Sequence, residues 1–339
     1  MNYRVPTPNV KEFSPKIYPC YRAQEKHILD GNLEKSFWEK APFTEDFQDI
    51  EGDLRPTPRY RTRVKMLWDD EAVYFGAELW GDEIWATLTE RDCIIFQDND
   101  FEIFIDPDND THAYCEFEMN ALNTVWDLLL TKPYRDGGFP LNSFDIKGLK
   151  TAVKIEGTLN HPSSENQKWT AEIVIPFTSV LECCGQNTKN PKRGDFWRIN
   201  FSRVHWTVDV VDGQYQKRLD ASGKPFPEDN WVWSPMGIVN MHYPELWGYL
   251  FFCQDEKDKV TLPPDEYLKW EMRKIYYALH KSYDEKGFFS VEDIALPHKK
   301  IKVFVMPHGF EICSPAEGGG QWILHSDSQM LIQKEGSHE

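Results

Sequence analysis

The sequence predicts an all-β fold: a two-sheet β-sandwich of the immunoglobulin-like or jelly-roll type, with a C-terminal helix and a small β extension. Two observations lead to this prediction. Segments in which apolar and polar residues alternate recur up to residue 253, separated by turn residues and with almost no amphipathic helix between them. After residue 254 one stretch has helical spacing, and further alternating segments follow it.

The same patterns divide the chain into three parts. Residues 1–25, rich in proline, are expected to form an extended arm, residues 26–253 the sandwich, and residues 254–339 the helix and short strands. Apolar residues recur at helical spacing from Leu268 to Leu279, which predicts a helix over 264–284 with four short strands after it. In the sandwich we expect strands at 27–29, 62–68, 72–80, 101–106, 114–120, 124–130, 149–158, 169–177 and 197–206.

Composition excludes several classes of partner. The formal net charge of -17 makes nucleic acid and anionic lipid poor partners, because phosphate binding needs a basic patch. No apolar run approaches the roughly 18–20 residues of a membrane span. The polar, proline-punctuated N-terminus has no apolar core of a signal peptide, so we expect a cytoplasmic protein, or a secreted or periplasmic one whose signal has been removed. Seven cysteines without a CxxC pair favour reduced thiols.

An acidic hairpin at residues 99–130 is the strongest functional pattern. Like charges on neighbouring strands repel, so solvent, the arginines Arg198 and Arg203, a cation or the hydroxyls of a ligand must compensate them. Such carboxylates can bind sugar hydroxyls, hold calcium or act as acid and base. The alternative is a solvated sheet face balanced by arginines. The polar face of the hairpin gathers Glu102, Asp106, Glu116, Glu118 and Asn120.

The turn of this hairpin carries a DxDxD spacing. Asp106, Asp108 and Asp110 resemble the start of a calcium loop and are the candidate metal ligands. However, Thr111 stands where an EF-hand requires glycine and Phe117 where it requires the bidentate glutamate. An EF-hand is therefore excluded, and a simple acidic turn is favoured over a metal site.

Aromatic residues supply a second functional signal. The chain has 13 Trp and 14 Tyr, and two or three exposed rings would suffice to stack on the C–H face of a pyranose, although most are expected in the core. No HExxH, GxSxG, P-loop or dinucleotide fingerprint occurs, so these enzyme classes have no support. The candidate rings are Trp85, Phe96, Tyr134, Trp206, Trp231, Trp233 and Trp247.

Several segments together resemble the family 9 carbohydrate-binding modules. They are ILDGNLEKSFWEKA, VKMLWDDEAVYFGAEL, DNDFEIFIDPDNDTHAYCEFEMNALNTVWDLLL, WTAEIVIPF, WRINFSRVHW and NWVWSPMGIVNMHYPELWGYLFF, which span residues 26–253 in order. The resemblance implies a β-sandwich that binds sugars, often at the chain ends of glucans or xylans. It implies no required cofactor, with structural calcium common in the family.

The resemblance also implies particular ligand residues. Glu102 of the EIFID segment matches a sugar-binding glutamate, and Phe96 falls where one of two sugar-sandwiching tryptophans is expected. The second aromatic should precede the last strand, where the chain has Met241-His242-Tyr243, and Trp231, Trp233 or Tyr243 are its substitutes. Arg198, Asn200 and Arg203 lie on a strand that carries polar ligand contacts in the family.

We therefore expect a non-catalytic protein that binds oligosaccharide or polysaccharide and supports polysaccharide breakdown. One alternative is a glycoside hydrolase that uses two hairpin carboxylates. The other is a sandwich that has lost its sugar site and serves protein interaction. A hydrolase or a second copy of the chain are the expected protein partners. The expected ligand set is Phe96, Glu102, Glu116, Glu118, Arg198, Asn200, Arg203, Trp231 and Trp233.

Overall fold

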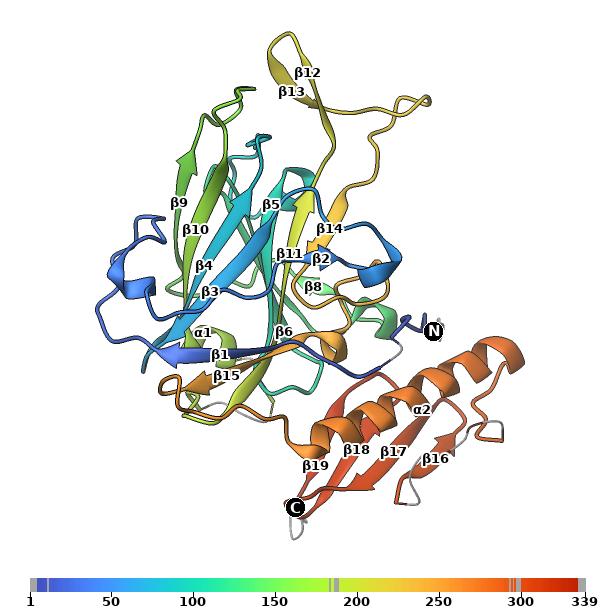
Figure 1. The fold of residues 1–339 in the computed structure, drawn as a ribbon. Helices are drawn as coiled ribbons and strands as arrows, with labels where there is room; N and C mark the ends of the chain where they lie inside the picture. The colour runs from blue at the N-terminus through green and yellow to red at the C-terminus, as the bar shows by residue number, and fades with distance from the viewer. Residues whose placement is uncertain are drawn as a thin grey trace.

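A β-sandwich forms the body of the protein, and a helix with a four-stranded sheet lies beside it (Figure 1). The structure is a computed structural model that describes residues 5–10, 12–182, 184–185, 189–292, 294, 296 and 300–334. Its strands agree with the predicted fold class, which is confirmed. The prediction for residues 1–4 of the arm lies outside the described residues.

Strand β1 (Ile17–Arg22) joins the two halves of the sandwich. It runs parallel to β15 (Gly248–Cys253) on one side and to β3 (Thr62–Trp68) on the other. One half has the order β8-β7-β6-β5-β11-β15, the other β3-β4-β10-β9, and β14 and β2 extend from β11. The remaining bounds are β2 Gln48–Asp49, β4 Ala72–Trp80, β5 Asp100–Asp106, β6 Tyr114–Asn120, β7 Val125–Leu130, β8 Pro140–Leu141, β9 Lys150–Glu156, β10 Lys168–Pro176, β11 Phe196–His205 and β14 Asp229–Val232.

The apolar residues of the alternating segments meet between the two halves. Phe75 of β4 contacts Phe201 of β11 edge to face, with ring centroids 5.9 Å apart, and Phe101 of β5 stacks on the same Phe201 ring. Ile103 and Ile173, from opposite halves, are fully buried in this core. Burial of one face of each strand is the physical reason for the alternation in the sequence.

The N-terminal part differs from the prediction. Residues 17–22 form β1 instead of part of an extended arm. The strand predicted at 27–29 is absent, because this segment turns over β10 and is held there by the Glu172 carboxylate. Glu172 accepts hydrogen bonds from the backbone N–H of Asp30 and Gly31 and from Trp38 Nε1, and its Oε1 lies 2.9 Å from His27 Nε2.

Short elements connect the strands. A two-stranded hairpin of β12 and β13 projects from the end of the sandwich that lies away from α2 (Figure 1). Their bounds are β12 Val208–Val211, β13 Gln214–Lys217, α1 Phe177–Leu181, and the 3-10 turns η1 Ser36–Trp38, η2 Gly52–Leu54, η3 Ile95–Gln97, η4 Tyr134–Asp136 and η5 Pro244–Leu246.

The C-terminal extension consists of α2 (Pro264–Lys286) packed on the sheet β16-β17-β18-β19. Proline at the first helical position suits the start of α2, and Gly287 in the left-handed region (φ 79°) ends it. The sheet strands are β16 Lys302–Met306, β17 Gly309–Pro315, β18 Gln321–His325 and β19 Met330–Gln333.

A second hydrophobic core joins the extension to the sandwich. Phe104 and Trp247 of the sandwich pack in it with Met272 and Ile275 of α2 and with Leu324 of β18. Burying several large side chains at such a junction stabilises it by about 1.5–3 kcal/mol for each. The extension is therefore an integral layer of the described structure.

Two further expectations from the sequence concern membrane-spanning helices and disulfide bonds. No helix in the described part of the chain is long and apolar enough to cross a membrane. None of the six described cysteines forms a disulfide bond, as expected from their scatter.

Candidate functional site

The candidate site lies on the outer face, which we define as the face of β5, β6, β7 and β11 that points away from the sandwich core. Residues directly opposite each other on paired strands share a face. Glu102 of β5 stands opposite Glu118 of β6 and Ser202 of β11, and Glu118 stands opposite Trp126 of β7. In the next row Phe104 stands opposite Glu116.

The C-terminal extension covers one part of this face. Phe104, Tyr114 and Leu128 belong to the second core beneath α2 and the 241–247 segment. Trp126 packs against that core, and the other residues of its row, Glu118, Glu102 and Ser202, are buried as well. Next to this covered part, the outer face carries buried carboxylates.

Four of these carboxylates form the acidic cluster, which comprises Asp100, Glu102, Glu116 and Glu118. Oxygens of Asp100, Glu102 and Glu118 all lie within 4.8 Å of one another. Asp100 Oδ1 accepts a hydrogen bond from Val204 N at 3.2 Å, and Glu118 Oε2 accepts one from Phe96 N at 3.0 Å. All four side chains are buried, Glu116 the least at 7 % exposed.

Burial sets the acid–base properties of the cluster. It raises the pKa of Glu102 to about 7. Burial, reinforced by the charge of neighbouring carboxylates, raises the pKa of Asp100, Glu116 and Glu118 well above the usual range. The folded protein therefore favours protons, a cation or hydrogen-bond donors next to these groups.

Aromatic side chains border the cluster. Tyr134, 42 % exposed, packs edge to face on His242 with centroids 4.5 Å apart. Burial and the charges of Glu116 and Glu118 raise the pKa of Tyr134 to about 12. Trp126 is half-buried beside Glu118, and its Nε1 has no hydrogen-bond partner among the described residues.

A third part of the border comes from the end of β11 and the β12–β13 hairpin. Trp206 Nε1 donates to Phe96 O at 2.9 Å, and Lys217 Nζ lies 3.3 Å from the centroid of the Trp206 ring. Phe96 is half-buried against Trp85 and Trp206. These contacts place the predicted Phe96 at the edge of the acidic cluster with its ring partly accessible.

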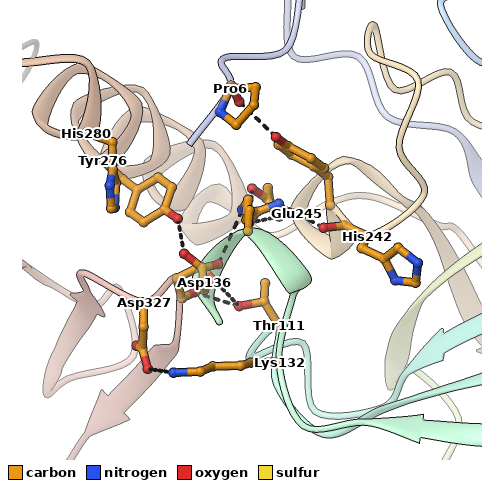
Figure 2. A network of polar contacts seen from close by, with 12 residues as sticks. Pro6, Thr111, Lys132, Asp136, His242, Glu245, Tyr276, His280 and Asp327 are labelled. Carbon is orange, nitrogen blue, oxygen red and sulfur yellow. Dashed lines mark hydrogen bonds and ion pairs between the residues drawn. The ribbon is translucent and has the colours of Figure 1, made fainter. Parts of the chain in front are cut away.

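A network of polar contacts joins η4 (Tyr134–Asp136) to the 242–245 segment and to α2, and Figure 2 shows its Asp136, His242, Glu245 and Tyr276. Arg135 donates to both carboxylate oxygens of Glu245, at 2.8 and 3.0 Å, and to the backbone oxygen of His242 at 2.9 Å. Tyr276 of α2 donates to Asp136 Oδ1 at 2.7 Å. Burial and the Arg135 charge lower the pKa of His242 to about 3, so its ring is neutral.

The structure separates two predicted ligand residues from the acidic cluster. Arg198 donates to the backbone oxygens of Glu245 and Trp247, and its Nη2 lies 3.3 Å from Glu266 Oε2 of α2. Asn200 is fully buried and exchanges hydrogen bonds with the backbone of Ser234. The expectation that both line an open ligand face is wrong, because the extension and the 234–247 segment cover them.

Three other predicted ligand residues lie inside the sandwich. Trp231 and Trp233, 3 % and 0 % exposed, belong to its core and offer no free ring face. Arg203 is also enclosed, and donates to Thr62 Oγ1 at 3.0 Å and to Trp80 O at 2.8 Å. The placement expected for these residues is wrong. Arg203 stands two residues after Phe201 in β11, so its side chain points to the same side as Phe201, toward the core, whereas that of Ser202 points to the outer face.

The acidic turn brings Asp106, Asp108 and Asp110 together, with oxygens within 4.8 Å. Asp106 accepts hydrogen bonds from the backbone N–H of Asn109 and Thr111. Asp110 accepts from His112 N at 2.7 Å and from Gln329 Nε2 at 3.0 Å, and so links the turn to the extension. Calcium binding by this turn stays a prediction.

Two larger hollows elsewhere in the described structure are not lined by the predicted ligand residues. One of about 590 Å³ lies on the other half of the sandwich, lined by Phe43, Arg63 and Lys168 among others. Arg63 and Lys168 both pair with Glu78 there, at 2.7 and 3.1 Å. Another of about 910 Å³ lies between the N-terminal residues and α2.

Sequence reasoning overlooked two members of the site. Asp100 continues the alternation of Glu102 two residues earlier, so extending the pattern would have found it. Trp126 lies in a strand that the alternation predicted, but it belongs to the site because it stands opposite Glu118 on the neighbouring strand. The sequence does not reveal this register between the two strands.

The fold and this site define a β-sandwich module with a buried acidic cluster and aromatic residues at its border. Residues 28–193 match the family model described as carbohydrate family 9 binding domain-like. The resemblance predicted from the sequence is therefore confirmed over residues 28–193.

Three solved structures are similar to this chain. A candidate carbohydrate-binding protein from Bacteroides uniformis matches with a TM-score of 0.50 and 16 % identity, covering 70 % of this chain and 100 % of that one. Family 9 carbohydrate-binding modules from Caldicellulosiruptor kristjanssonii, in complex with cellotriose and with glucose, match with TM-scores of 0.43 at 17 % and 16 % identity. They cover 74 % and 73 % of this chain and 100 % of each structure. No curated protein matches the sequence.

Proposed function

We propose that this chain binds carbohydrate without reacting with it, over Glu102, Glu116 and Glu118 and between the rings of Trp126 and Tyr134. The family match supports carbohydrate as the ligand class. The observation that supports the location is the pairing of Glu102 with Glu118, and of Glu118 with the half-buried Trp126, on the outer face of the sheet, where the carboxylates themselves are 1–7 % exposed. The proposed role is accessory to polysaccharide breakdown by a hydrolase.

The chemistry of the site suits sugar hydroxyls. Carboxylate oxygens accept hydrogen bonds from hydroxyl groups, and such charge-assisted bonds are short and strong. An aromatic ring can pack on the apolar C–H face of the sugar at the same time. Hydroxyl donors would also relieve the repulsion between Glu102 and Glu118. Binding of this kind is expected in the micromolar to millimolar range, about -8 to -4 kcal/mol.

Calorimetric titration with gluco-, xylo- and manno-oligosaccharides tests this proposal. The substitution Glu102→Gln keeps the shape of the side chain and removes its charge, and we expect it to weaken binding about tenfold or more. Glu285→Gln, an exposed carboxylate on α2, is the matched control and should bind as the wild type does. Equal affinity of Glu102→Gln and wild type would place the ligand elsewhere.

A parallel assay for reducing-sugar release separates binding from hydrolysis. We expect binding without release. Sugar release that is lost in Glu102→Gln would instead make the cluster catalytic, since paired carboxylates at short range serve retaining glycosidases.

One observation favours protein interaction as a second candidate function. Strand β16 is an edge of its sheet, paired only with β17 in the described structure, and its Phe304, Val305 and Met306 are exposed. An exposed apolar edge can pair with the same edge of a second copy. Light scattering of the wild type and of Val305→Lys tests this: a dimer that becomes a monomer supports it, and a monomeric wild type excludes it.

A further inference from the structure

The hollow on the other half of the sandwich is separate from the acidic cluster. It measures about 590 Å³ and lies between the 32–43 segment and strands β3, β4, β9 and β10. Its lining residues on β3 alternate with Val64 and Met66 of the core, so the hollow lies on the face that points away from the core. The volume falls within the roughly 300–1,000 Å³ typical of small-molecule sites.

Lys65 of β3 lines this hollow without an acidic neighbour. It stands opposite Gly76 of β4 and forms an isolated bridge with Phe43 on its other side, so neither neighbour offers a carboxylate. In the described part of the chain its ammonium group has no ion pair, and its hydrogen bond to Trp38 O is long, at 3.4 Å. Lys65 is half-buried, and burial together with the Arg63 charge lowers its pKa. Such an ammonium group favours an anion from outside the chain.

Arg63 adds a second cation to the same place. Its Nε donates to Glu78 at 2.7 Å, and its terminal nitrogens make no hydrogen bond within the described ranges. The guanidinium carbon lies 3.7 Å from the centroid of the Phe43 ring, and Lys65 Nζ lies 4.4 Å from the same centroid. Both cations therefore gather at one ring, where a ligand carboxylate would offset their charge.

The other cations of the hollow are already paired. Lys168 Nζ lies 3.1 Å from a carboxylate oxygen of Glu78, and Lys35 Nζ lies 2.7 Å from one of Glu172. Among the described residues that line the hollow, Lys65 is therefore the cation without an acidic partner.

Two exposed carboxylates, those of Glu34 and Glu39, also line the hollow. They would repel a ligand with many negative charges, but they can accept hydrogen bonds from hydroxyl groups. A ligand with one carboxylate among several hydroxyls suits both the cations and these acceptors. A uronic acid residue of a carbohydrate has this composition.

We propose that this hollow binds a uronic acid residue of an acidic oligosaccharide, with the ligand carboxylate at Lys65 and Arg63 and the ligand hydroxyls at Glu34 and Glu39. The inference rests on the proposed function for the class of ligand, carbohydrate, and adds a second site that selects for an acidic sugar. The two sites are on different halves of the sandwich, since Glu102 lies on β5.

Calorimetric titration of the full chain with galacturonate and glucuronate oligosaccharides, beside neutral gluco-oligosaccharides, tests this second site. Lys65→Met keeps the length of the side chain and removes its charge. We expect it to weaken uronate binding about tenfold or more and to leave the affinity for neutral oligosaccharides unchanged. Raising the salt concentration should weaken uronate binding to the wild type in the same direction.

Lys150→Met is the matched control. Lys150 is exposed on β9, on the same face of the sheet as Glu156, and does not line the hollow. Both affinities should stay as in the wild type. Thermal melting checks the folding of the variants, and Lys65→Met should have a Tm equal to or above that of the wild type, because it removes a half-buried, unpaired charge.

Four results would overturn the second site. They are no binding of any uronate oligosaccharide, unchanged uronate affinity in Lys65→Met, equal weakening in Lys150→Met, and binding of an acidic peptide such as tetra-aspartate as tightly as the uronates. Failure of the two proposals is distinguishable. Absent uronate binding beside intact neutral binding overturns the second site alone, whereas absent neutral binding beside uronate binding that Lys65→Met weakens overturns the site at the acidic cluster alone.

Discussion

Arg198 of β11 and Glu266 of α2 form a buried ion pair across the junction of the sandwich and the extension, with Nη2 and Oε2 3.3 Å apart. Tyr249 donates to the same Glu266 carboxylate at 2.6 Å, and Lys269 Nζ lies 2.6 Å from its other oxygen. Burial would raise the pKa of Glu266, but Lys269 and Arg198 outweigh it and hold that pKa below its usual value. A residue predicted to contact sugar thus joins two layers of the fold.

Glu266→Ala is therefore expected to destabilise the protein. Removing one partner of a buried ion pair leaves the other charge uncompensated and costs about 3–5 kcal/mol. Denaturant unfolding measures the loss. The control is Glu285→Ala, whose exposed pair with Lys281 on the same helix should contribute about 0–0.5 kcal/mol. Equal effects of the two substitutions would contradict the structural role of the Arg198–Glu266 pair.

Glu172→Ala is expected to release residues 26–40 from the sandwich. The fully buried Glu172 carboxylate accepts hydrogen bonds from Trp38 Nε1 at 2.6 Å, Gly31 N at 2.8 Å and Lys35 Nζ at 2.8 Å. Alanine would leave these donors buried without an acceptor, at a cost of about 3 kcal/mol or more. Limited proteolysis should then cut first within residues 26–40.

The exposed contact between Arg22 and Asp70 provides the control for this prediction. Asp70→Ala should change the free energy of unfolding by less than about 1 kcal/mol and leave the proteolysis pattern unaltered. Cleavage of Glu172→Ala at the same positions and rates as the wild type would show that this carboxylate does not anchor the segment.

The acidic cluster predicts that stability in chelator falls as pH rises from about 5 to 8. Folded-state pKa values of these carboxyls are raised, to about 7 for Glu102, whereas unfolded glutamate titrates near 4.3. Over this interval the folded state binds more protons than the unfolded state, so the free energy of unfolding decreases with pH. The slope is up to about 1.4 kcal/mol per pH unit for each proton.

Glu118→Gln isolates this effect, because it removes one of the titrating carboxyls. Its stability should fall less steeply with pH than that of the wild type. The buried His205 and His242, whose pKa values are lowered chiefly by burial, oppose the trend below about pH 6.5. Both histidines are present in the wild type and in Glu118→Gln, so their contribution cancels when the two pH profiles are subtracted. Parallel pH profiles would show that the cluster does not titrate in this range.

Tyr134→Ala is expected to weaken oligosaccharide binding without loss of stability, since the ring is 42 % exposed. Loss of one aromatic contact costs about 0.5–1.5 kcal/mol, or about two- to tenfold in affinity. Phe139→Ala removes another exposed ring from the same loop and should leave affinity unchanged. If both substitutions weakened binding equally, a general effect on the loop, and not stacking by Tyr134, would be responsible.

Local alternation was sufficient to predict much of the sandwich. The strands at 62–68, 72–80 and 114–120 have the predicted bounds. The same parity placed Glu102, Glu116 and Glu118 on one face, because successive side chains of a strand point to opposite sides. Helical spacing likewise predicted α2 to within two residues at its end.

Exposure was not predictable from residue type. Trp233 and Tyr134 were both candidates for a sugar platform, but the first is enclosed in the core and the second is 42 % exposed. An aromatic ring is equally suited to a core and to a ligand surface. Only its neighbours in space decide which role it has.

The sequence by itself determined the alternation, the turns and the set of carboxylates on one sheet face, because these depend on residues close together in the chain. The tertiary structure decided which part of that face is open. It buried Arg198 against Glu266, 68 residues away, and Glu102 and Glu118 side by side on neighbouring strands. Contacts between segments that are far apart in the chain leave no periodic pattern in the sequence, so they cannot be predicted from local patterns.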